Sequence, residues 1–308
     1  MNQMLNNLII TVLAVSAPIL LCAIGSLLCD RAGVTNISLE GTMLISAFAA
    51  VAGCYFTENW ITGILAGVGA GLAASLFFAL ITIKFGGAEL VVGFTMNVLL
   101  DGLSIFLLRT IFDVSGSLVS ERIVKIPEFS VPVLKDIPIL GGFMTDLNIL
   151  VCFAYISVFL AYFILKKTQL GLQIISSGEN PQAAATVGIS VYRIRLLTLV
   201  ITGVLCGLAG AQLSIGYLSM FTEGMTAGRG FIALVAVMFA RGNALRVLLV
   251  TMLFGTAEML SNYLQLYEYS SYLILMIPYI CVIALTIIQL MLEKKKQKIK
   301  RAVKKAVQ

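Results

Sequence analysis

The 308-residue sequence contains no histidine, and its six cysteines are scattered without a C-x-x-C pair. The lack of histidine excludes histidine-based catalytic triads, histidine proton relays and most zinc chemistry. Cysteines that lie mostly inside apolar stretches are typical of small buried residues, and not of a disulfide framework or a metal site. We therefore expect no catalytic residues and no metal site in this chain.

Charged residues are also scarce, at 12% of the sequence against 59% hydrophobic residues, whereas a soluble domain carries about 25% charged residues. Apolar runs long enough to cross a bilayer recur along almost the whole chain,. This recurrence argues against the alternative of a soluble protein with one very apolar core. No basic residue precedes Arg31, so the N-terminus lacks the basic region of a secretory signal, and residues 8–28 are predicted to be the first span.

Hydropathy predicts an all-α, polytopic transmembrane helical bundle with about nine spans, in a range of eight to ten. The seventh span, about 12 residues, rises only about 18 Å and cannot cross the membrane alone. It is interpreted as a half-helix or re-entrant segment near 224–242, or as a span whose first turn starts near Glu223. Glycines four residues apart, as in Gly203 and Gly207, predict close helix packing,. The predicted spans are 5–28, 39–56, 61–83, 90–111, 147–165, 196–220, 229–240, 244–262 and 271–291.

The basic residues indicate an orientation. Eight of the 21 Lys and Arg lie between Lys294 and Lys305, which predicts a transmembrane domain over 1–292 followed by a basic cytoplasmic tail over 293–308. Nine crossings then place the N-terminus and the acidic loop of about 112–146 outside. The cytoplasmic segments, which include Arg31, Arg195 and Arg241, become 29–38, 84–89, 166–195, 241–246 and 292–308. The tail favours contact with anionic membrane lipid. A nucleic-acid partner is the alternative for a basic tail, and it is not expected because no binding fold accompanies the tail.

The stretch 170–211 contains a turn signal followed by an alanine-rich segment. Asn180 suits a helix cap and Pro181 suits the first turn, so a short helix is predicted from Gln182 to Val187, ending at Gly188. Its small, smooth face could receive another protein. An ordinary cytoplasmic connector is the equally open alternative.

This stretch resembles the cytoplasmic loop of ABC importer permeases of the ribose and branched-chain-amino-acid superfamily. The matching pattern, G-x-N-x-x-A-A-x-x-x-G-I, reads from Gly178 to Ile189. The stretch 30–50 resembles the nucleoside branch, which is associated with basic-membrane-protein-type binding proteins. The segment 228–255 also resembles the family, although Ala244-Leu245-Arg246 stands where a proline is usual. The matching residues of the stretch 30–50 are Arg31, Gly33, Asn36, Glu40, Gly41 and Met43.

The resemblance implies a permease subunit of the bacterial plasma membrane, itself not an enzyme, that carries nucleosides. It implies separate ABC ATPase subunits that hold ATP and Mg, an extracellular solute-binding lipoprotein, and a second permease chain, with a heterodimer favoured over a homodimer. The chain has no G-x-x-x-x-G-K-[ST] motif, so no cofactor is expected in it. The residues that the resemblance assigns to ATPase coupling are Gly178, Glu179, Asn180, Pro181, Ala183, Ala184, Ala185 and Gly188.

Polar residues inside the apolar spans are candidates for the solute pathway, because they are costly in lipid and usually face a cavity or a partner. For Asp101, a structural hydrogen bond to a neighbouring helix is the alternative. For Glu258, a solvated carboxylate at the interface is the alternative. The candidates are Asn97, Asp101, Gln212, Thr222, Glu223, Glu258 and Asn262.

Other functions stay open at this stage. Sugars or branched-chain amino acids are the next choices of solute. An ion-coupled secondary transporter is the alternative of another class, with Asp101 and Glu258 as a minimal coupling pair. A membrane enzyme is disfavoured, because the sequence contains neither paired carboxylates at ligand spacing nor a nucleophile motif.

Overall fold

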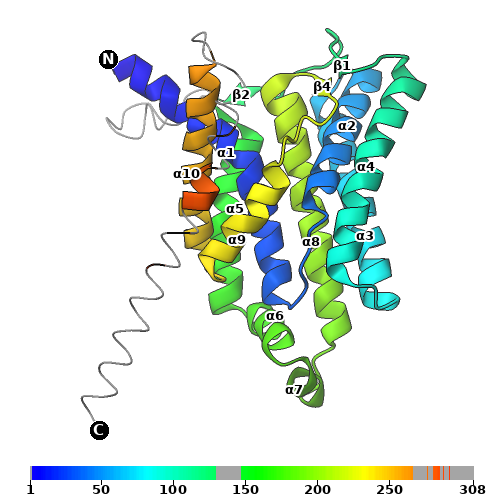
Figure 1. The fold of residues 1–308 in the computed structure, drawn as a ribbon, viewed down its shortest axis with the longest axis vertical. Coiled ribbons are helices and arrows are strands. Elements are labelled where there is room, and N and C mark those ends of the chain that lie inside the picture. The colour runs from blue at the N-terminus through cyan, green and yellow to red at the C-terminus, as the bar shows by residue number, and fades with distance from the viewer. Residues whose placement is uncertain are drawn as a thin grey trace. The chain divides into compact units, whose positions relative to one another are not determined.

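The computed structural model describes residues 2–129 and 147–265, together with 276, 280–284, 287 and 291. The chain divides into two compact units, Met1–Met252 and Leu253–Gln308, whose boundary falls inside helix α10. Figure 1 shows the first unit as a bundle of long helices. The predicted basic tail over 293–308 and residues 130–146 of the predicted outer loop lie outside the described residues.

Helices dominate the described residues, and seven of them are long and apolar enough to cross a membrane. The long helices are α1 (Asn2–Arg31), α2 (Leu39–Thr57), α3 (Trp60–Ala79) with its extension η1 (Leu80–Lys84), α4 (Glu89–Phe112), α5 (Ile149–Lys167), α8 (Val191–Ala211) with its extension η3 (Gln212–Leu218), and α10 (Ala244–Leu264). The helical membrane bundle is confirmed. The count of about nine spans is not reached, and the predicted ninth span, 271–291, lies mostly outside the described residues.

The predicted seventh span forms α9 (Arg229–Ala240), a helix of 12 residues. At 1.5 Å per residue it is about half the length needed to cross the hydrocarbon core. The prediction of a helical turn starting near Glu223 is wrong, because residues 223–228 form turns and α9 starts only after Gly228. Gly228 has a positive φ of 82°, a conformation that a residue without a side chain adopts at little cost,.

The packing of α3 against α8 follows from their glycines. A Cβ atom added to Gly71 would lie 2.4 Å from the carbonyl oxygen of Gly203, and one added to Gly207 would lie 2.6 Å from the Cα of Val68. These separations exclude any side chain, so the two backbones lie in direct contact, as the four-residue glycine spacing predicts. The helices α2, α3 and α8 thus form a tightly packed centre against which α1 and α4 are placed.

The two ends of the first unit differ. At one end, two short helices, α6 (Gln169–Glu179) and α7 (Pro181–Thr186), connect α5 to α8 and project beyond the bundle (Figure 1). At the other end, short strands pair as β1 (Ser117–Leu118) with β4 (Phe221–Thr222) and as β2 (Glu128–Phe129) with β3 (Leu147–Asn148), both antiparallel. We call these the α7 end and the strand end.

Candidate functional site

The site is built around an interruption in the helices rather than around a catalytic cluster. After α1 ends, residues 34–37 run without helical structure, and α2 starts only at Leu39. Figure 1 shows this segment rising along the bundle before α2 begins. Val34, Asn36 and Ile37 are buried in it. The start of α2 therefore lies inside the bundle and not at its α7 end.

Glu40 joins this interruption to the start of α9. One carboxylate oxygen accepts a hydrogen bond from the amide of Gly228 and the other accepts one from the amide of Gly230, each at 2.7 Å. A Cβ added to Gly230 would lie 2.5 Å from the amide nitrogen of Glu40. The carboxylate thus satisfies two amides at a helix N-terminus, where the helix dipole favours a negative charge.

Asn97 of α4 secures the start of α2 in the same way. Its Oδ1 accepts a hydrogen bond from the amide of Gly41 at 2.9 Å, and its Nδ2 donates to the carbonyl of Ile37 at 3.0 Å. Asn97 is buried, whereas Asp101, one turn further along α4, is exposed. The two residues, predicted to share a face of α4, therefore have different surroundings. The side-chain amide of Asn97 links Ile37, at the end of the interruption, to Gly41 in the first turn of α2.

The remaining family-motif residues near the first loop make contacts around the end of α1 and the turn into α2. The guanidinium of Arg31 donates to the carbonyls of Arg241 and Gly242, at 3.1 and 3.0 Å. Asn36 accepts two hydrogen bonds from Ser38 and so shapes the turn into α2. Gly33 lies against Gly178, where a Cβ would come within 3.0 Å of the partner backbone. These residues hold α1, α2, α6 and the turn after α9 in one arrangement.

The short helix predicted from Gln182 to Val187 is present as α7, one residue earlier at each end. Asn180 caps α7, since its Oδ1 accepts a hydrogen bond from the amide of Ala183 at 3.0 Å, and Pro181 occupies the first turn. Gly188 follows the helix with a φ of +85°. The side chain of Ala184 is buried, whereas those of Ala183 and Ala185 are exposed.

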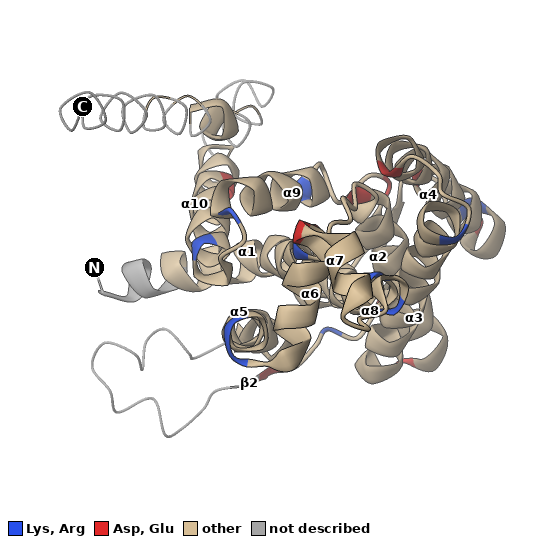
Figure 2. Ribbon diagram, turned by 90° about the horizontal axis from the view of Figure 1, so that it is seen from below, with Lys and Arg blue, Asp and Glu red and all other residues tan. Residues whose placement is uncertain are grey.

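An exposed apolar residue lies beside this short helix. Val187 is 74% exposed and follows α7 directly. Figure 2, seen from below, shows α6 and α7 with basic residues on α5 and α8 nearby. The loop therefore presents a small apolar surface with basic residues nearby and the exposed Glu179 at the end of α6.

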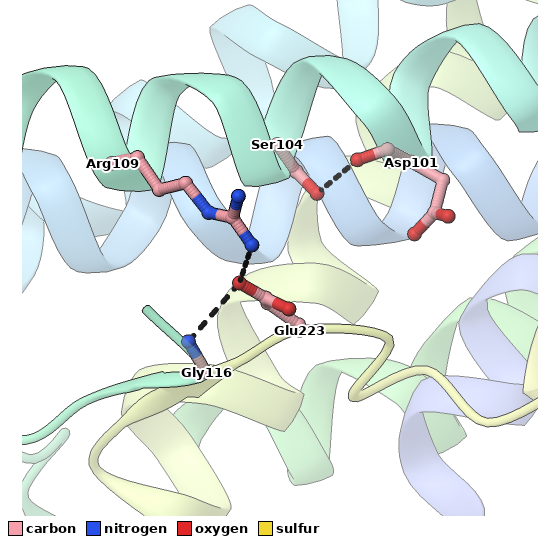
Figure 3. A network of polar contacts seen from close by, with 5 residues as sticks. All are labelled: Asp101, Ser104, Arg109, Gly116 and Glu223. Atoms are coloured by element: carbon pink, nitrogen blue, oxygen red, sulfur yellow. Dashed lines mark hydrogen bonds and ion pairs between the residues drawn. The ribbon is translucent and has the colours of Figure 1, made fainter. Parts of the chain in front are cut away.

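At the strand end, Glu223 connects α4 to the segment before α9. Its carboxylate accepts a hydrogen bond from the amide of Gly116 at 3.0 Å and lies 3.8 Å from the guanidinium of Arg109. Thr222 is paired with Ser117 in the β1–β4 ladder. Figure 3 shows the side chains of Arg109 and Asp101 extending from the same side of α4 toward the segment that carries Glu223.

Asp101 lies in the middle of α4, and its side chain is exposed. Ser104 donates to its backbone carbonyl at 2.8 Å, and Figure 3 shows its carboxylate pointing away from the helix. A charged group at this depth is costly if it faces lipid, so it must face water, the solute or another chain.

On the same side of α4, Phe94 meets Phe231 of α9, with ring centroids 6.3 Å apart. Neither phenylalanine was predicted from the sequence, because apolar residues carry no signal inside apolar spans.

Gln212 lies elsewhere. It is fully buried at the start of η3 and lines a pocket of about 190 Å³ with polar and apolar residues of α1, α5 and the strand end, including Asn148 and Lys125. Within the described part of the chain, its amide group has no hydrogen-bond partner. Glu258 and Asn262 belong to the second unit and lie four residues apart on α10. Within the first unit, the predicted pathway residues therefore do not form one cluster.

Metal binding has no candidate among the residues that the structure describes, where no three His, Cys, Asp or Glu side chains are grouped to hold an ion.

Comparisons with known proteins place these features in a family. The sequence profile of the permease component of branched-chain amino acid transport systems matches residues 8–283. The guanosine ABC transporter permease protein NupQ of Bacillus subtilis is 35% identical over 92% of this chain and 92% of its own length. The nucleoside ABC transporter permease protein NupC of Lactococcus lactis subsp. cremoris is 33% identical over 82% of this chain and 80% of its own length.

A solved structure supports the fold. It is described as a metal-chelate type ABC transporter in an inward-facing conformation, and it matches with a TM-score of 0.50 at 18% identity, over 91% of this chain and 84% of its own. At this identity the likeness concerns the arrangement of the helices alone.

Proposed function

Because the chain belongs to the family of permease components of branched-chain amino acid transport systems, and is thereby a permease subunit of an ABC importer, we propose that the solute it carries is a nucleoside. Two relatives of similar length that are named for guanosine and nucleoside transport support this choice. The chain is a multi-pass membrane protein and a transport subunit, not an enzyme.

The observation that carries the choice of a neutral solute is the binding of Glu40 to the start of α9. Interrupted helices in transporters often direct free N-termini at anionic groups of the solute. Here the carboxylate of Glu40 takes the amides of Gly228 and Gly230, and Asn97 takes the amide of Gly41. An anionic group would meet the Glu40 charge instead of free amides. This arrangement suits an uncharged solute with hydroxyl groups better than an amino acid carboxylate.

The pathway that we propose runs along the side of α4 that carries Asp101 and past Glu223 and Thr222 at the strand end. Glu258 and Asn262 stay candidates on α10. Asn97 contributes to the pathway indirectly, because its hydrogen bonds hold the interruption against the start of α2. Gln212 contributes from the separate pocket of about 190 Å³. In this proposal the crossing count stays within the expected range of eight to ten, with α9 as a half-helix that does not cross the membrane alone,.

ABC ATPase subunits are the partners that the family implies. We place them on the loop of about 166–195. The ATPase, and not this chain, holds ATP and Mg. The cap of Asn180 on α7 and the exposed side chains of Ala183, Ala185 and Val187 support this site. Gly178, Glu179, Pro181 and Gly188 shape the loop. The solute-binding lipoprotein then meets the strand end, and a second, different permease chain completes the pathway.

Uptake measurements test the function. Cells that express the chain with its partner subunits should take up radiolabelled guanosine when a protonophore has removed the proton gradient. Uptake should stop when the Walker A lysine of the partner ATPase is replaced. Uptake that the protonophore abolishes and the ATPase variant leaves intact would instead establish the alternative of an ion-coupled secondary transporter.

Competition distinguishes the solutes. Excess unlabelled adenosine or uridine should suppress guanosine uptake, whereas glucose, ribose or leucine should leave it unchanged. If a sugar or a branched-chain amino acid is carried and nucleosides are not, the nucleoside assignment is wrong and the permease role remains.

A further inference from the structure

We propose that Phe94 and Phe231 form the nucleobase site of this permease and that Asp101 accepts hydrogen bonds from the ribose hydroxyls. The proposal rests on the proposed function, since it names the contacts that a nucleoside would make on the pathway side of α4. Phe231 lies in the segment 228–255 that resembles the family, but the sequence assigned neither phenylalanine to the solute pathway. All three residues belong to the first unit.

Glycines fix the positions of both rings. Gly93 precedes Phe94, and a Cβ added to Gly93 would lie 2.8 Å from the Cβ of Ile37. Gly230 precedes Phe231, and its backbone is pressed against Glu40. The two phenylalanines therefore extend from α4 and α9 immediately beside the same segment, 37–40, where α2 begins. The site is assembled by backbone packing and not by flexible loops.

The rings are accessible and lie near each other. Phe94 is 51% exposed and Phe231 is 36% exposed. Their centroids lie 6.3 Å apart with an interplanar angle of 31°. A base held between two rings needs about 7 Å between them, which is two carbon contact distances of about 3.5 Å. Because the two rings are tilted by 31°, they would have to turn toward parallel and separate before a base fits between them. Stacking of this kind accepts purines and pyrimidines alike.

Asp101 stands on the same stripe of α4. Seven residues separate it from Phe94, which is close to two full turns and a rise of about 10.5 Å. Side chains of a helix tilt toward its N-terminus, so the Asp101 carboxylate leans toward the level of Phe94. A carboxylate accepts hydrogen bonds from two adjacent hydroxyls. An exposed carboxylate in the middle of a span also identifies this stripe as facing something other than lipid.

Fluorescence of the assembled importer in nanodiscs, without the binding lipoprotein, tests the base site. Trp60 is the only tryptophan of this chain, so Trp60→Phe with Phe231→Trp leaves the chain one tryptophan, at the site, and the same assembly with Trp60→Phe alone gives the signal of the other chains to subtract. Guanosine should quench this reporter saturably. Phe94→Ala in the same background should raise the half-saturating concentration by about tenfold or more. Phe106→Ala, an exposed phenylalanine on another side of α4, should leave it unchanged.

Asp101→Asn tests the sugar contact. The reporter should respond to guanosine at a lower concentration than to 2′,3′-dideoxyguanosine, and Asp101→Asn should reduce this difference without changing the base preference. An equal loss for both ligands would mean that Asp101 has only a structural role.

Two results overturn the proposal while leaving the nucleoside function intact. In one, the importer carries guanosine and neither quenching nor the effect of Phe94→Ala appears. In the other, Phe94→Ala increases solute leak and ATP hydrolysis without ligand, which would make the ring pair a gate. An importer that carries no nucleoside at all contradicts the proposed function itself.

Discussion

At the residue scale, Glu40 is the side chain on which the interrupted region depends. Both of its oxygens are bound to amides at the start of α9, which has too few residues to be anchored by its own length. Glu40 was identified from the sequence through a resemblance alone, without a role. A carboxylate of an apolar span attracts attention as a pathway group, whereas its partners, two backbone amides 188 and 190 residues away, leave no trace in the sequence pattern.

Replacing Glu40 by alanine should therefore destabilise the protein. Hydrogen bonds to a charged group contribute about 1.5–3 kcal/mol each, so the loss of both should cost about 3 kcal/mol or more. Glu40→Gln, which keeps one acceptor oxygen, should cost less. Thermal unfolding of the purified importer in detergent measures both variants.

Glu58→Ala provides the matched control. Glu58 pairs with Arg122 at 3.6 Å, but both side chains are more than half exposed, and such pairs contribute about 0–1 kcal/mol. If the Glu40 and Glu58 variants lowered the unfolding temperature equally, the cap on α9 would have no special importance.

At the element scale, long apolar runs predicted their helices well, and short elements were predicted only where caps were present. The predicted bounds of α7, from Gln182 to Val187, differ by one residue at each end from the observed helix, Pro181–Thr186. The prediction used the cap at Asn180, Pro181 in the first turn and Gly188 after the helix. The 34–37 segment was predicted as part of a cytoplasmic connection, yet the structure buries Val34 and Ile37 inside the bundle. Its depth depends on contacts with Asn97 and Gly93 of α4. Hydropathy describes how apolar a segment is, but not where an extended segment lies.

The site was less predictable than the fold for the same reason. Asp101 and Glu223 were named as pathway candidates because charges stand out in apolar spans. Phe94 and Phe231 could not be recognised as site residues, because apolar side chains are equally common on lipid-facing surfaces. Only the position of Gly93 and Gly230 against the segment 37–40 distinguishes them.

The α7 surface gives the prediction at this scale. Ala183→Asp and Ala185→Asp place a carboxylate on exposed positions, so the permease should insert normally while co-purification of the ATPase and transport fall by about tenfold. Ala184 is buried, so Ala184→Asp should instead reduce the amount of folded permease, because an unpaired charge would be buried. Quantifying the ATPase bound per permease separates the two effects.

Val119→Asp is the control, since Val119 is 69% exposed near the strand end. It should leave ATPase binding unchanged. Wild-type ATPase binding by both Ala183→Asp and Ala185→Asp would mean that α7 is a connector and that the ATPase docks elsewhere.

At the scale of the whole molecule, the distribution of basic residues and the packing of the first unit agree. Arg31, Arg195 and Arg241 come from segments far apart in the sequence and are assigned to one side of the membrane by their charge. In the structure Arg31 donates to the carbonyl of Arg241, and Arg195 donates to the carbonyl of Ala32, the residue after Arg31. The segments that charge assigns to one side therefore meet at one end of the bundle, the α7 end. This agreement supports a cytoplasmic α7 end, and the sidedness itself requires a direct measurement.

Single cysteines at the two ends provide that measurement. Val187→Cys and Val119→Cys are chosen because these side chains are 74% and 69% exposed, in a background of Cys152→Ser and Cys281→Ser, since the other four cysteines are buried. A membrane-impermeant maleimide added to intact cells should label the Val119→Cys variant, whereas the Val187→Cys variant should react only after the membrane is opened. The reverse pattern would place the α7 end outside. An ATPase that hydrolyses cytoplasmic ATP could not then dock on α7, so this labelling tests the orientation and the coupling surface together.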